Sequence, residues 1–286
     1  MPVLADIGYQ SGWLDVLQAN FMRNAFIGGT LVALAAGVIG YFVVLRRDAF
    51  AAHALAHIGF PGATGAVLVG VPVTLGLAVF CVAGGLAIGA LGKRVDQREV
   101  ATGTVLAVAT ALGVLFSSMA TTSANTVTSL LFGNLLAISS DQLVTYGIFT
   151  AVLVVALGAV ARPLLFASIN PQVAEAQGVP VRALGVVFMV MLALVITMAV
   201  QVVGTLLLFA LVVTPAATAI SLTARPGRVV AVATGLGLVA VWAGLVLSAM
   251  WNLPPSFPIV SIAFVAWLVA TQLAPRVAGS GPTRRS

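Results

Sequence analysis

Long apolar runs separated by short polar connections dominate this sequence. A helix needs about 20 mostly apolar residues to cross the hydrocarbon core of a bilayer, and hydropathy divides the chain into about nine such segments. Their approximate bounds are 23–45, 49–70, 72–92, 100–119, 142–165, 183–201, 203–222, 229–250 and 257–274. Residues 183–222 are long for one span and just sufficient for two, so the pattern predicts eight or nine spans. The expected fold is an all-α, polytopic membrane helical bundle.

The basic residues indicate how the chain is oriented. Clusters of Lys and Arg follow alternate spans, and the intervening connections contain none. All thirteen Lys and Arg residues except Arg23 therefore fall on one side. Because basic residues are enriched on the cytoplasmic side of membranes, we predict an outer N-terminal segment at 1–22. The transmembrane domain is expected at 23–274, and a basic cytoplasmic tail at 275–286.

Composition supports a lipid environment and excludes several classes of function. The chain is 61% hydrophobic and only 7% charged, whereas soluble domains carry about 25% charged residues. The formal charge of +6 is scattered between apolar runs, so we expect membrane lipid and no nucleic acid as a partner. The sequence has neither a zinc-protease H-E-x-x-H motif nor a phosphate loop, so we expect no enzymatic activity in this chain.

Two histidines form the most distinctive polar pair. His53 and His57 are the only histidines, four positions apart in an apolar run. Side chains at this spacing share one helix face, with Cβ atoms about 5–6 Å apart, and ionisable residues inside a span commonly mark an ion pathway. We therefore predict a transit site for a divalent cation. Two nitrogen ligands without a carboxylate suit zinc better than manganese.

Further candidates for the pathway lie later in the sequence. Asn134 and Gln201 are candidate additional metal ligands. The moderately apolar region 120–140 is expected on the outer side as a partly buried helix, either a gate element or a surface helix. Pro61 and Gly62 are expected to interrupt the histidine helix, since proline lacks the N–H that a helix interior requires.

The connection 166–182 predicts a short cytoplasmic helix between two spans. Asn170-Pro171 can begin a helix, with proline in its first turn, and Gly178 before Pro180 can end it. Such a helix suits the docking of a partner, although an ordinary loop is the alternative. The candidate docking residues are Asn170, Pro171, Glu175, Gly178, Val179 and Pro180.

Four segments together resemble the permease subunits of metal-cation ABC transporters, the zinc, manganese and iron uptake family. They are "RRDAFAAHALAHIGFPGATGA", "SLLFGNLLAIS", "NPQVAEAQGVPVRAL" and "QVVGTLLLFALVVTPAATA", within a resemblance that covers roughly residues 20–274. In that family's pattern His57 matches a histidine, whereas His53 occupies the place of an aspartate and Ala52 that of a glycine. Segment 170–180 matches the family's loop that docks on the ATPase.

The resemblance implies a homodimeric permease in the plasma membrane, a cytoplasmic ATP-binding subunit and an extracytoplasmic solute-binding protein. No permanently bound cofactor is implied, because the metal is the cargo. We predict an importer for zinc first, with manganese or iron next. Two alternatives remain: a stand-alone secondary metal transporter, disfavoured because all carboxylates lie at span ends or in connections, and an ABC permease for siderophore or cobalamin chelates.

Overall fold

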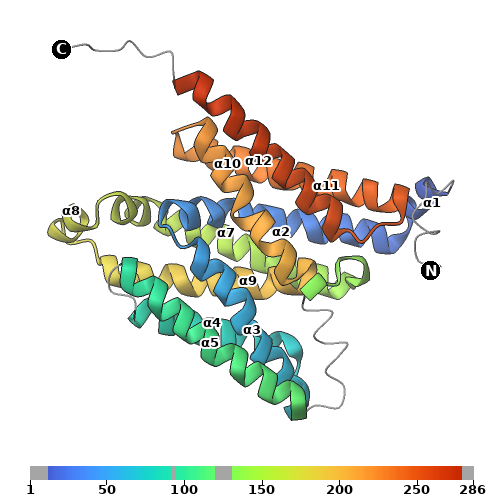
Figure 1. Ribbon diagram of the computed structural model, residues 1–286, viewed down its shortest axis with the longest axis horizontal. Coiled ribbons are helices and arrows are strands. Elements are labelled where there is room, and N and C mark those ends of the chain that lie inside the picture. The colour runs from blue at the N-terminus through green and yellow to red at the C-terminus, as the bar shows by residue number, and fades with distance from the viewer. Residues whose placement is uncertain (1–11, 92–94, 120–130, 279–286) are drawn as a thin grey trace.

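The computed structural model describes residues 12–91, 95–119 and 131–278, which form a bundle of helices (Figure 1). Within these ranges the regular secondary structure is entirely helical, as predicted. The elements are α1 Trp13–Gln18, α2 Asn20–Leu45, α3 Ala49–Val69, α4 Val73–Leu91, α5 Val95–Met119, the 3₁₀ helix η1 Leu135–Ala137, α7 Ser140–Ile169, α8 Pro171–Ala176, α9 Val181–Val212, α10 Thr214–Leu222, α11 Pro226–Trp251 and α12 Ser256–Ala278.

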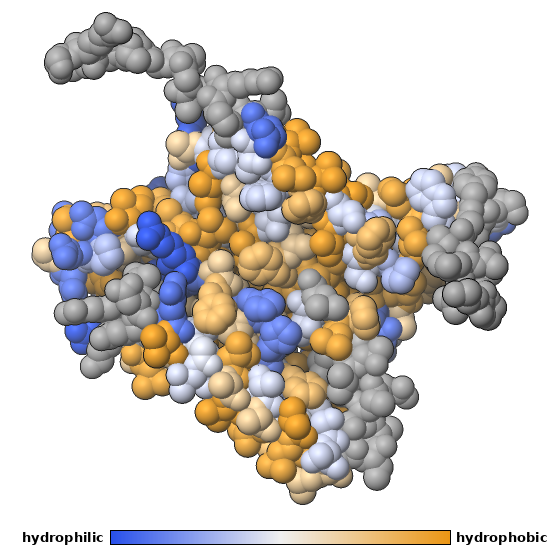
Figure 2. All heavy atoms as spheres, viewed as in Figure 1, coloured by the Kyte–Doolittle hydropathy of each residue, from blue (hydrophilic) through white to orange (hydrophobic). Residues whose placement is uncertain are grey.

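The apolar helices agree with the predicted spans. Seven are long and apolar enough to cross a membrane, in α2, α3, α4, α5, α7, α9 and α11. Two shorter apolar stretches, Leu207–Leu222 and Ser256–Gln272, occupy the remaining two predicted spans. The polytopic helical bundle is therefore confirmed. On the face that Figure 2 shows, most of the described surface is apolar, and hydrophilic residues gather at the end that carries α8, with a smaller patch near the middle.

Helix α9 runs through the middle of the bundle, with α3–α5 on one side and α10–α12 on the other (Figure 1). Close packing between α3 and α4 depends on two glycines. A Cβ at Gly62 would collide with the carbonyl oxygen of Gly76, and one at Gly76 would collide with that of Gly62. Small residues allow this approach of membrane helices, and the contact fixes α3, the helix of both histidines, against its neighbour.

The predicted interruption of α3 at Pro61 is wrong. The helix continues from Ala49 to Val69 with Pro61 inside it. The hydroxyl of Thr64 donates to the carbonyls of Phe60 and Pro61, at 3.0 and 3.3 Å. Proline in membrane helices is tolerated where neighbouring helices and Ser or Thr side chains satisfy the backbone. Because proline has no N–H, Pro61 cannot donate to the carbonyl of His57, four residues earlier.

The boundary expected between the spans 183–201 and 203–222 corresponds to a break at Gly204, where φ is 80° and ψ is 167° inside α9. In a continuous helix the Thr205 N–H would bond to the Gln201 carbonyl. Here the N–H of Asn134 donates to that carbonyl, at 3.2 Å. Segment 131–139 therefore lies in the break, and Gly133, with φ of 74°, permits its backbone to approach Gly204.

The rest of the predicted 120–140 element is only partly described. Residues 120–130 lie outside the described ranges, as do 1–11 and 279–286 of the predicted outer segment and basic tail. Residues 131–139 contain η1 and the contact with the α9 break. The segment thus contacts the one position where α9 departs from helical geometry.

Candidate metal site and amide cavity

His53 and His57 lie together on one face of α3. Their ring centroids are 4.8 Å apart, with an angle of 72° between the ring planes. Both side chains are half-buried. The Phe209 ring of α9 packs edge-on against His53, with centroids 5.9 Å apart. The helical spacing thus brings the two imidazoles together, and the second half of α9 covers one of them.

This geometry suits two nitrogen ligands to one ion. Imidazole nitrogens bind zinc at about 2.0–2.1 Å, and rings at this separation can reach a common ion after a modest rotation. Within the described part of the chain, no group of three or more His, Cys, Asp or Glu residues is placed to hold a metal. The pair therefore leaves several coordination positions for water or backbone oxygen, including the His57 carbonyl that Pro61 leaves without its helix donor.

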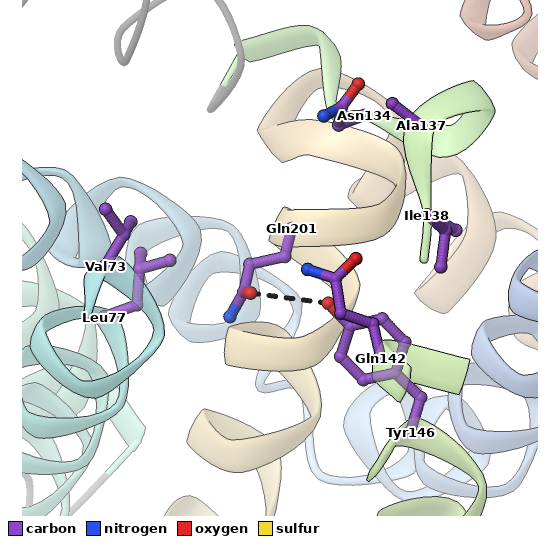
Figure 3. A pocket seen from close by; sticks show the side chains of 8 residues that line it. All are labelled: Val73, Leu77, Asn134, Ala137, Ile138, Gln142, Tyr146 and Gln201. Atoms are coloured by element: carbon purple, nitrogen blue, oxygen red, sulfur yellow. Dashed lines mark hydrogen bonds between the residues drawn. The ribbon is translucent and has the colours of Figure 1, made fainter. Parts of the chain in front are cut away.

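Asn134 and Gln201 lie elsewhere, in a cavity of about 160 Å³ between α4, segment 134–138, α7 and α9 (Figure 3). We call it the amide cavity. Neither histidine is among its lining residues, so the four predicted ligands form two separate pairs. The lining residues are Val73, Leu77, Asn134, Ala137, Ile138, Gln142, Tyr146 and Gln201.

Hydrogen bonds hold the Gln201 side chain across this cavity. Its Oε1 accepts from the Thr74 hydroxyl at 2.9 Å and from the Tyr146 hydroxyl at 3.4 Å, the contact drawn in Figure 3. Its Nε2 donates to the Thr197 carbonyl at 3.3 Å. The Gln142 Oε1 accepts the Ser139 N–H at 3.0 Å in a capping box. Because both oxygens already have donors, the cavity suits water or a hydrated ion better than direct coordination.

Sequence reasoning missed Gln142 and Tyr146. They are four positions apart near the start of α7, so they share the helix face that lines the cavity. The same spacing that revealed the histidine pair could have revealed these two residues. A glutamine and a tyrosine at the polar end of an apolar helix, however, are common enough at a membrane interface to attract no notice.

The predicted short helix after residue 170 is confirmed as α8. The Asn170 Oδ1 accepts the Val173 N–H at 3.2 Å, and Pro171 occupies the first turn. At the other end Gly178 has φ of 81°, and its N–H donates to the Glu175 carbonyl at 3.0 Å. Only Ala174 of α8 is buried, so the helix is held at both ends and presents most of its side chains outward.

The mostly apolar helical bundle, the polar pair inside one span and the exposed capped helix between two others are the features expected of a membrane permease. The ABC 3 transport family model matches residues 18–274, and the chain belongs to this family of metal-cation ABC transporter permeases.

Individual relatives match over nearly the whole chain. The manganese transport system membrane protein MntC of Listeria innocua is 34% identical over 264 residues, covering 91% of this chain and 93% of the relative. The manganese import system permease protein ScaB of Streptococcus parasanguinis is 31% identical, covering 92% and 95%. The solved structure of PsaBC from Streptococcus pneumoniae in complex with Fab has a TM-score of 0.82 at 28% identity, covering 93% and 96%. The chain is thus a permease subunit of a metal ABC importer.

Proposed function

We propose that this permease carries a divalent first-row transition metal ion past His53 and His57, and that manganese is the ion it transports by preference. The observation behind the path is the meeting of the chain's two imidazoles at 4.8 Å on one face of a membrane span. Manganese is favoured because the curated relatives named above are manganese permeases. It is also the weakest binder of the first-row divalent ions at nitrogen sites, and conduction requires easy release.

Zinc is the second candidate, and it rests on the ligands themselves. His53 stands where the family's pattern has an aspartate. Within the described part of the chain, no carboxylate joins the two imidazoles in a group that could hold a metal. That ligand set favours zinc over manganese. The zinc preference inferred from the sequence stays a prediction, and the names of the relatives favour manganese instead.

The route begins, in this proposal, at the amide cavity. The exposed basic residues Arg162, Arg225 and Arg228 lie toward the end of α7 and at the start of α11. Because basic residues are enriched on the cytoplasmic side of membranes, this side is the cytoplasm, with the N-terminus outside and the C-terminus inside. The starts of α4 and α7, which line the amide cavity, then face outward. Its neutral amides can hold the water that accompanies an ion released from an extracytoplasmic solute-binding protein.

The energy comes from a separate cytoplasmic ATP-binding subunit, which docks on α8. Asn170 and Pro171 begin this helix, and the exposed Glu175 lies in its last turn. The residues that connect it to α9 are Gly178, Val179 and Pro180. Two copies of the permease form the channel. Movement of α8 on ATP binding switches the histidine site from outer to inner access, so the ion is held only transiently by His53 and His57.

Metal-dependent ATP hydrolysis tests the choice of cargo. The complete complex, with its ATP-binding and solute-binding subunits, is reconstituted in liposomes and supplied with manganese, iron or zinc. We expect manganese to stimulate hydrolysis most and to accumulate inside the vesicles. Stronger stimulation by zinc, with greater uptake of zinc, would make zinc the cargo, as the two imidazole ligands favour. Stimulation only by a chelated metal would replace this function with that of a chelate importer.

A further inference from the structure

One buried arginine contacts the histidine helix and both helices that flank α8. Arg46 follows the last residue of α2, and its Nε donates to Asp48 Oδ2 at 3.2 Å. The Arg46 side chain is 8% exposed and that of Asp48 only 1%. Asp48 directly precedes α3, five residues before His53. The ion pair therefore fixes the first turn of the helix that carries both histidines.

The same guanidinium contacts the two helices on either side of α8, the end of α7 and the first part of α9. Its Nη1 donates to the hydroxyl of Ser168, near the end of α7 and two residues before Asn170. That distance is 3.3 Å. The guanidinium carbon also lies 5.0 Å from the centre of the Phe188 ring in the first part of α9. Arg46 thus reaches the helix before α8 and the helix after it.

Helix α9 also comes close to the guanidinium at a second position. A Cβ at Gly185, one turn before Phe188, would lie 3.5 Å from Arg46 Nη2. The planar guanidinium has five donors in a fixed fork, which lets one side chain contact Asp48, Ser168 and the Phe188 ring in different directions. A lysine ammonium, as a point charge on a flexible stem, has no such fork.

Stability alone does not account for a charged pair at this depth. Removing two charges from water is costly, and well-packed apolar residues of similar volume are often as stable as a buried ion pair. What an ion pair adds is fixed geometry between the elements it joins. Here those elements are the start of α3 and the two attachments of α8.

We propose that Arg46 and Asp48 transmit movement of α8 to the start of α3, so that the ATP-driven step reaches the histidine site. This inference rests on the proposed function, in which α8 docks on the ATP-binding subunit and α3 carries the ion. When the ends of α7 and α9 move with α8, they displace the guanidinium. Asp48 then shifts the first turns of α3. Arg46 is a positioning residue and does not touch the ion.

The test measures ATP hydrolysis and manganese uptake in the same proteoliposomes of the complete complex. The variants are Arg46→Gln, Asp48→Asn and Arg46→Lys, and the control is Arg47→Gln, the exposed neighbouring arginine. We expect Arg46→Gln and Asp48→Asn to hydrolyse ATP while the ions carried per ATP fall roughly tenfold, within the usual range of coupling between sites. Arg46→Lys should lie between these variants and the wild type, and Arg47→Gln should match the wild type.

A further variant keeps the test decisive if loss of Arg46 prevents assembly. Ser168→Ala removes the contact of Arg46 with α7, together with the bond from the Ser168 hydroxyl to the Leu164 carbonyl within α7. It should lower the ions carried per ATP without lowering hydrolysis. Wild-type ratios in both Ser168→Ala and Arg46→Lys would overturn the link, as would a proportional fall in hydrolysis and uptake. If His53→Ala/His57→Ala abolishes uptake while every Arg46 and Ser168 variant keeps wild-type coupling, only the link fails. Normal uptake in the histidine variant would instead remove the proposed function.

Discussion

Replacing Gly204 by alanine should destabilise the bundle by about 2–4 kcal/mol, because two costs add at one position. Gly204 has φ of 80° and ψ of 167°. Non-glycine residues occupy that region at a cost of about 1–3 kcal/mol. An added Cβ would also collide with the Gly133 amide and the Leu131 carbonyl. Moving segment 131–139 away would break the bond from the Asn134 N–H to the Gln201 carbonyl, worth about 1 kcal/mol.

The assay is unfolding of the purified permease in mixed micelles, with Gly147→Ala as the matched control. Gly147 lies in the interior of α7, and a Cβ there would meet nothing within 4 Å. Alanine at such a helical site should stabilise by roughly 0.5–1 kcal/mol. The two substitutions are chemically identical and should therefore shift stability in opposite directions. If Gly204→Ala unfolds at the wild-type midpoint, the break is not a constraint on the fold and segment 131–139 is not held by it.

Three further outcomes follow from the site. Glu175→Ala and Gly178→Ala should lower manganese uptake per ATP hydrolysed, the latter because Gly178 has φ of 81°; wild-type ratios in proteoliposomes would count against docking on α8. His53→Asp should raise manganese uptake relative to zinc in competition assays, because a carboxylate oxygen suits manganese, and an unchanged ratio would move selectivity to the solute-binding protein. Acidification should lower uptake, because protonated imidazole cannot bind metal; a wild-type profile that stays flat to pH 5 would contradict imidazole ligation.

The features that depend on local pattern were predictable from the sequence. Spans follow from hydropathy, α8 follows from Asn170, Pro171 and Gly178, and the meeting of His53 and His57 follows from their spacing. Each depends on one continuous stretch of sequence, where sequence distance and spatial distance agree.

The features that depend on distant partners were not predictable. Pro61 lies inside a continuous helix against which α4 packs closely at Gly62 and Gly76. The α9 break falls at Gly204 because segment 131–139 satisfies the freed Gln201 carbonyl there. The contact of Arg46 with Ser168 joins residues 122 positions apart. Nothing in the local pattern near any of these residues specifies its partner.

Manganese uptake by the reconstituted complex with His53→Ala/His57→Ala is the most direct test of the ion path. Leu68→Ala, an exposed position on the same helix, is the control. We expect the complex to assemble and hydrolyse ATP but to lose manganese uptake, while the control transports at the wild-type rate. Wild-type uptake without the two imidazoles would contradict the account and place the path elsewhere in the bundle.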